Sequence, residues 1–199
     1  MRRLALTLGV AAAVASLAWI MMTGLGHILR APAPDPTVDD APALLPSAAP
    51  ATPATPRIKA TIYFASEDGQ RLVPTEREVP LATDAAAQAR AILEAQFAAE
   101  APTALVPAIP AGTTLRALFV SAQHDVFVDL GPSVRATHPG GSTQELLTVY
   151  AIVNAVLTNL PTLQQVQILI DGQEVDTLAG HLDLRRPLRK NDALIAGSR

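Results

Sequence analysis

The stretch from Ser142 to Leu178 changes its hydrophobic period once, and this change constrains the fold more than any other feature of the chain. Between Val166 and Ile170 apolar residues occupy every second position, as they do in a β-strand. The segment before it carries apolar residues at helical spacing, namely Leu146, Val149, Tyr150, Val153, Val156, Leu157 and Leu160. Pro161 separates the two patterns because proline lacks an amide donor and disfavours a helical conformation in the residue before it. The stretch therefore predicts a helix that ends near Asn159, followed by a strand.

The start of this helix has its own signature. Gly140 and Gly141 interrupt the chain, Ser142 follows them, and Glu145 stands three residues later. Serine and glutamate at this spacing are typical of a capping box, in which both side chains bind free amides of the first helical turn. We expect that role for Ser142 and Glu145. Free amides at a helix start also attract anions, so Gly140, Gly141 and Ser142 form a candidate anion site.

The other segments predict an α+β domain over residues 57–190. Asp171-Gly172 is suited to a two-residue turn, so residues 173–178 should fold back on 165–170. A helical pattern occupies residues 84–99. Alternating patterns predict strands at 58–64, 114–121 and 125–130, with an edge strand or irregular arm at 71–73 next to Pro74. Residues 131–140 read as a polar loop, and residues 191–199 should fray. The expected architecture is two helices packed on one antiparallel or mixed sheet.

The first 30 residues predict a transmembrane anchor. An apolar run from Leu4 to Leu29 lies between Arg2-Arg3 and Arg30, and it exceeds the roughly 20 residues that cross a bilayer. A cleaved signal peptide with its site at Ser16-Leu17-Ala18 is the alternative. Because basic residues before a first span stay in the cytoplasm, the chain after Arg30 should lie outside the cytoplasmic membrane.

Residues 31–56 predict a disordered linker. They hold eight prolines, together with alanine, serine, threonine and a few acidic residues. Such a composition buries too little apolar surface to fold and favours extended conformations. The segment should therefore act as a spacer between the anchor and the domain.

Composition excludes several classes of function. The chain has no cysteine, so disulfides, thiol catalysis, cysteine-ligated zinc and an N-terminal lipid on cysteine are excluded. A net charge of −3 provides no basic field for nucleic acid. The four histidines do not pair with one another at helical spacing, so we expect no metal and no cofactor.

Seven short tracts, taken together and in order, resemble the GerMN domain of sporulation and spore-germination proteins and of many bacterial envelope proteins. They are Ile62-Tyr63-Phe64, Leu72-Val73-Pro74 with Glu78-Val79-Pro80, Ile109-Pro110-Ala111-Gly112-Thr113-Thr114-Leu115, Val128-Asp129-Leu130, Tyr150-Ala151-Ile152-Val153-Asn154, Val166-Gln167-Ile168-Leu169-Ile170-Asp171-Gly172 and Gly180-His181-Leu182-Asp183. The resemblance spans about Ile58 to Leu188. It implies a compact α+β domain outside the cytoplasmic membrane with no established catalytic activity. The chain has one such domain, whereas the spore protein has two.

The tracts that resemble the family contain four polar residues of interest, namely Asp129, Asn154, His181 and Asp183. We expect a buried polar cluster that ties strand, helix and tail together, and a functional surface is the alternative. A serine hydrolase would need Ser142 with a histidine and an acid, but Ser142 lacks the small-x-Ser-x-small elbow.

The sequence as a whole favours a non-catalytic binding or assembly module, anchored in the cytoplasmic membrane by one span. Its partner would be a protein or the cell wall, with self-association also open and nucleic acid excluded. A cell-wall hydrolase and a small-anion sensor at Gly140-Gly141 are the alternatives.

Overall fold

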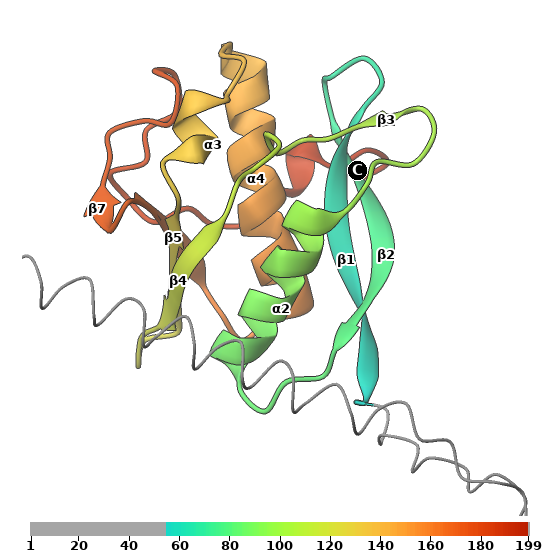
Figure 1. The fold of residues 1–199 in the computed structure, drawn as a ribbon, viewed down its shortest axis with the longest axis vertical. Coiled ribbons are helices and arrows are strands. Elements are labelled where there is room, and N and C mark those ends of the chain that lie inside the picture. Colours follow the sequence, from blue (N-terminus) through green and yellow to red (C-terminus); the bar gives the residue numbers. More distant parts are fainter. Residues whose placement is uncertain (1–54, 199) are drawn as a thin grey trace, which may run out of the picture. The chain divides into compact units, whose positions relative to one another are not determined.

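The computed structural model describes residues 55–198, all of which belong to one compact unit, Ala51–Arg199. Its fold is α+β, with helices packed between and beside two small sheets (Figure 1). The predicted anchor, residues 1–30, and nearly all of the predicted linker, residues 31–56, lie outside the described residues. Within the described part, no helix has the length and apolarity needed to cross a membrane.

The first sheet contains three strands in the order β2-β1-β3. β1 (Arg57–Ser66) pairs in antiparallel fashion with β2 (Leu72–Pro80) and with the two-residue β3 (Leu105–Val106). The predicted strand at 58–64 is confirmed, and β2 is an edge strand as Pro74 indicated. Tyr63 and Phe64 are both buried although they point to opposite faces, because β1 is central and covered on both sides.

The second sheet contains four strands in the order β4-β5-β6-β7, so the single sheet expected from sequence is in fact two. β4 (Leu115–Val120) and β5 (Asp125–Leu130) form the predicted hairpin. β5 runs parallel to β6 (Gln165–Ile170). Parallel neighbours need a long crossover connection, and the segment that contains α4 provides it here.

Helix α4 (Ser142–Asn159) lies at the centre of the domain in Figure 1. It packs against β1, β6 and α2 (Ala85–Ala98). Its end at Asn159, just before Pro161, confirms the prediction. Its buried surface is much wider than one stripe, because partners lie on several sides. Val153 and Val156 are fully buried.

Three local predictions need correction. The closing hairpin turns at Asp171-Gly172 as expected, both with positive φ, but β7 (Gln173–Glu174) has only two residues and does not extend to Leu178. The predicted polar loop 131–140 contains a short helix, α3 (Ser133–Ala136).

The tail is the third correction, since residues 191–198 pack on the domain instead of fraying. Asn191 exchanges two hydrogen bonds of 3.0 Å with the side chain of Asn154 in α4. A short 3-10 helix, η2 (Asp192–Leu194), follows, and the Ala196 amide donates to the Leu72 carbonyl of β2 at 2.8 Å. These contacts hold the tail against both α4 and the first sheet.

Candidate functional site

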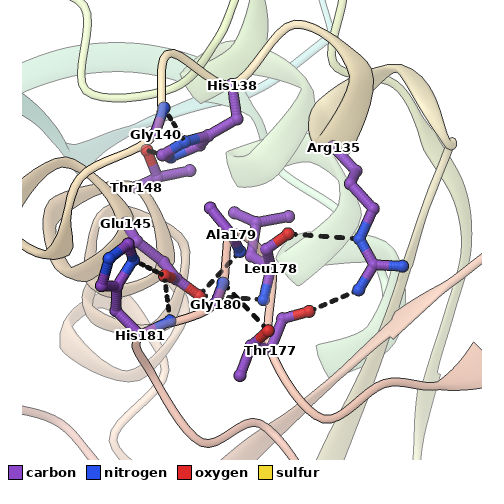
Figure 2. Close-up of polar contacts among 10 residues, drawn as sticks. All are labelled: Arg135, His138, Gly140, Glu145, Thr148, Thr177, Leu178, Ala179, Gly180 and His181. Atoms are coloured by element: carbon purple, nitrogen blue, oxygen red, sulfur yellow. Dashed lines mark hydrogen bonds and ion pairs between the residues drawn. The ribbon is translucent and has the colours of Figure 1, made fainter.

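Glu145 is the best-satisfied charged side chain near the start of α4. It has no exposed surface. One carboxylate oxygen accepts from the amides of Leu178 and Ala179, each at 2.9 Å, and the other accepts from the His181 amide at 2.8 Å. The His181 ring Nδ1 donates to that second oxygen at 3.0 Å (Figure 2). Glu145 is thus bound to the loop 177–181 rather than to its own helix.

The same loop is held from its other side by a cation. Arg135 in α3 donates from its guanidinium to the carbonyls of Thr177, at 2.6 Å, and Leu178, at 3.2 Å, as Figure 2 shows. The Glu145 carboxylate therefore accepts hydrogen bonds from the amides of the loop, and the Arg135 guanidinium donates hydrogen bonds to its carbonyls. Buried backbone groups need such partners, so the two side chains together replace regular secondary structure here.

The electrostatic balance at Glu145 favours the charged carboxylate. Burial by itself raises the pKa of the Glu145 carboxyl, but the backbone amides and the His181 ring that donate to it have the larger combined effect. The net result is a pKa below the ordinary value for glutamate. Glu145 is therefore ionised at neutral pH and serves as a structural anion.

A second chain of hydrogen bonds leaves the same end of α4 in another direction. Thr148, nearly buried at 2% exposure, donates from its hydroxyl to the Ala108 carbonyl at 2.7 Å. His138 Nε2 lies 3.2 Å from that hydroxyl, and His138 Nδ1 accepts from the Gly140 amide at 3.0 Å. Figure 2 shows His138 between Gly140 and Thr148.

These contacts define the tautomer of His138. Since Nδ1 accepts a hydrogen bond from the Gly140 amide and the Thr148 hydroxyl already donates to the Ala108 carbonyl, the Nε2 atom must carry the ring proton and donate to the Thr148 oxygen. The ring is therefore neutral. Consistent with this, burial lowers the pKa of His138, although the nearby Glu145 charge partly raises it.

Beside this second chain lies a pocket of about 480 Å³. One wall is the loop 106–111, the floor includes Leu147 of α4, and Pro139 and Gln144 close another side. Glu67 and Asp68, in the turn between β1 and β2, stand at its rim and are exposed. The interior is mainly apolar, which is typical of binding pockets.

The four polar residues singled out from sequence are not brought together. Asp129 accepts from Arg116 at 3.1 Å and from the Gly172 amide at 2.8 Å, where it fixes the β6–β7 turn. Asn154 binds the tail, as described above. Asp183 is exposed and forms an ion pair with Arg185, which holds the pKa of Asp183 well below its usual range. His181 binds Glu145, with its side chain 45% exposed.

The capping box predicted for Ser142 and Glu145 is wrong. Gly141 is the N-cap residue, and no side chain caps the first turn of α4. Glu145 instead binds backbone more than 30 residues away in sequence. For the candidate anion site, Gly141 and Ser142 are exposed, whereas the Gly140 amide is already donated to His138.

Sequence reasoning missed the residues that shape the pocket. Thr148 had no assigned role, the loop 106–111 was used only through its part in the family tract that begins at Ile109, and His138 was treated only as a histidine without a metal partner. One signal was available for Glu145, since it lies four residues before Val149 on a face that is otherwise apolar. In the part of the chain that the structure describes, no group of three histidine or acidic side chains could hold a metal ion.

The chain is similar to two solved structures. The tandem GerMN domains of the sporulation protein GerM from Bacillus subtilis align with a TM-score of 0.54 and 14% identity, over 72% of this chain and 51% of that one. The first GerMN domain of the same protein aligns with a TM-score of 0.47 and 14% identity, over 71% of this chain and 99% of that one. No curated protein sequence matches the chain.

A family model settles the relationship suggested by the seven tracts. The model named Germane, described as sporulation and spore germination, matches residues 61–176, which is more than half of the chain. The match runs from β1 through the β6–β7 turn and so includes α4 and both walls of the pocket. The chain belongs to the Germane, or GerMN, family.

Proposed function

We propose that this protein is a non-catalytic binding module of the bacterial envelope. Its GerMN domain would act outside the cytoplasmic membrane, held there by the apolar segment at residues 4–29 and spaced from it by the proline-rich linker. The partner would be a protein or the cell wall. Family membership and the apolar N-terminal run support this location.

The observation that carries the proposal is the state of Glu145. A catalytic acid or base needs a free lone pair or proton directed at a substrate. Both oxygens of Glu145 are occupied by loop amides and by His181, so its charge is used to hold the fold. The pocket nearby has an apolar interior, with carboxylates only at its rim. This division of roles fits binding better than turnover.

His138, the histidine nearest the pocket, gives the same indication. Both of its ring nitrogens are engaged, one by the Gly140 amide and one by Thr148. Among residues 55–198, every buried side-chain nitrogen and oxygen has a hydrogen-bond partner. Satisfied buried groups stabilise a structure, whereas unsatisfied ones often mark a reactive site.

A cell-wall assay tests the proposal against the hydrolase alternative. Purified full-length protein is incubated with cell-wall sacculi, and released soluble fragments are measured. We expect binding of the sacculi, or crosslinking to an envelope partner in cells, without release of fragments. Release by the parent that is lost in a folded His181→Ala variant would overturn the proposal.

Topology is tested separately by reporter fusion. A reporter joined after Arg199 should be active only outside the cytoplasm if the arginines at positions 2 and 3 orient the first segment. Activity only in the cytoplasm would contradict an envelope location.

A further inference from the structure

The pocket beside α4 is apolar inside and negative at its entrance. Its lining includes Leu147 and Ile109, which are buried, Ala108, which is partly buried, and Pro107, which is exposed. A volume of about 480 Å³ is large enough for one or two side chains. An apolar group that enters the pocket moves from water to an apolar surface, which is favourable because of the hydrophobic effect.

The negative charge at the rim of the pocket restricts which ligands can bind there. Glu67 and Asp68 line the pocket, and no lysine or arginine is among the described residues that do so. Asp68 accepts from the Ser66 hydroxyl at 2.6 Å and the Gln70 amide at 3.1 Å, which lowers its pKa and keeps it ionised. An apolar group followed by a cation fits this arrangement, whereas a phosphate or an acidic peptide is repelled.

The neighbouring strand suggests an extended peptide as the occupant. β3 is the outer strand of the first sheet, and its Val106 is 45% exposed while also lining the pocket. An edge strand offers backbone groups to another extended chain, and the adjoining pocket then receives a side chain of that chain. Gln144 is exposed on the opposite wall and can bind a peptide backbone group.

The wall of the pocket is rigid before any ligand binds. Pro107, Pro110 and Pro139 have fixed φ angles, and the Thr148 hydroxyl holds the Ala108 carbonyl in place. A wall that is already ordered loses little conformational entropy when a ligand binds.

We propose that this pocket binds an extended segment of a partner protein in which an apolar side chain is followed two residues later, on the same face, by a lysine or arginine. The apolar side chain fills the space above Leu147, and the cation pairs with Glu67 and Asp68. The inference rests on the proposed function as a binding module and names the chemistry of its partner.

The test uses purified full-length protein and fluorescently labelled, capped hexapeptides. The probe, called the Leu-Lys peptide, is Gly-Leu-Gly-Lys-Gly-Gly, in which the glycine between the two residues places both side chains on the same face of an extended chain. Its counterparts replace Lys by Glu (the Leu-Glu peptide) or Leu by Ala (the Ala-Lys peptide). Fluorescence anisotropy should show saturable binding of the Leu-Lys peptide. Binding of the Leu-Glu peptide should be about tenfold weaker, since like charges face each other at the rim. The Ala-Lys peptide should also bind more weakly, because its methyl group fills less of the pocket.

Two charge-reversal variants distinguish binding at the pocket from nonspecific electrostatic attraction to the protein. Glu67→Lys reverses the rim charge at an exposed residue, so it should leave the fold intact and weaken the Leu-Lys peptide about fivefold. Glu174→Lys makes the same change at an exposed residue of β7, in the other sheet, and should have no effect. Val106→Ser should weaken all Leu-containing peptides by removing apolar surface at the entrance.

Several results would overturn the inference. Equal weakening by Glu67→Lys and Glu174→Lys would show nonspecific attraction. Competition by free hexylamine as strong as that by the peptide would identify a small amine as the occupant. Failure of the Leu-Lys peptide to saturate would remove this pocket as a peptide site, yet binding of sacculi without turnover would still leave the proposed function standing.

Discussion

The first turns of α4 present two different surfaces. On one side Glu145 is sealed beneath the loop 177–181, with four donors on its carboxylate and no contact with water. On the other side Leu147 and Thr148 face an open apolar pocket. The buried charge stabilises the structure only because every lone pair is used. The pocket side keeps open space beside the helix, so the first turns of α4 carry both a sealed charge and the site at which we propose binding.

The largest loss of stability should come from removing the buried carboxylate of Glu145. Glu145→Ala leaves three buried amides and the His181 ring without their acceptor, so we expect a loss of about 3–5 kcal/mol in the free energy of unfolding. Urea denaturation followed by circular dichroism measures it.

Two variants serve as controls for that measurement. Glu145→Gln keeps the shape and one acceptor oxygen, so its loss should be smaller. Glu174→Ala removes an exposed carboxylate and should change stability by less than about 0.5 kcal/mol. A similarly small change in Glu145→Ala would refute the structural role of the buried charge.

A substitution at Thr148, beside the pocket, should cause a smaller loss of stability. Thr148→Val preserves the side-chain shape but removes the hydroxyl that joins His138 to the Ala108 carbonyl, which should cost about 1–3 kcal/mol. If the hydroxyl also positions the pocket wall, the Leu-Lys peptide should bind this variant more weakly under conditions in which the variant is fully folded. An unchanged unfolding curve would show that the wall is held by other contacts.

Acid should weaken the two sides in separate pH ranges. The pKa of His138 is lower in the folded state than its ordinary 6.5, so the unfolded chain binds the extra proton first. Stability is therefore complete above that value and is lost as the pH falls below it. The pKa of Glu145 is likewise lowered, from 4.5, so its contribution is lost only below that value.

A pH series on one variant distinguishes these ranges. His138→Gln should flatten the decline in stability that begins below pH 6.5 and leave the decline below pH 4.5 in place. The readout is the urea midpoint at each pH. A parent and variant with parallel profiles would exclude His138 as the group that titrates.

The smallest effect should be at Ser142, the first residue of α4. Its side chain makes no cap and is exposed, so Ser142→Ala should change stability by less than about 0.5 kcal/mol. Asp84 is the matched control because it caps α2 by accepting from the Ala87 amide at 2.8 Å, and Asp84→Ala should cost about 1 kcal/mol. Equal losses in the two variants would restore a capping role for Ser142.

Local patterns in the sequence were enough to predict most elements of the fold. The end of α4 follows from Pro161, and the β6–β7 turn follows from Asp171-Gly172, because each depends on backbone preferences of adjacent residues. The two-sheet arrangement was not predictable in the same way. It depends on β1 and β2 pairing with each other and not with any strand of the β4–β7 sheet, which is a choice between distant segments. β3 was missed for a similar reason, because its two residues become a strand only by pairing with Ala65 and Ser66 of β1.

The site was harder to predict for a related reason. Glu145 has the spacing of a cap, yet its partners are 33 to 36 residues further along the chain. Thr148 occupies a helix position like any other, and only the folded structure brings the Ala108 carbonyl to it, 40 residues away. Such interactions leave little trace in a local pattern, whereas the family resemblance was recognisable from several short tracts in order.

The contacts of the tail also bear on where the domain can be shortened. Leu184 is in the core, Leu188 pairs with β6, and Asn191 is bound to Asn154 of α4. A fragment that ends at Leu178 would leave the backbone of Val166 and the side chain of Asn154 without these partners. Because buried polar groups need partners, such a fragment should be less stable than the whole domain even though it keeps every strand and both long helices.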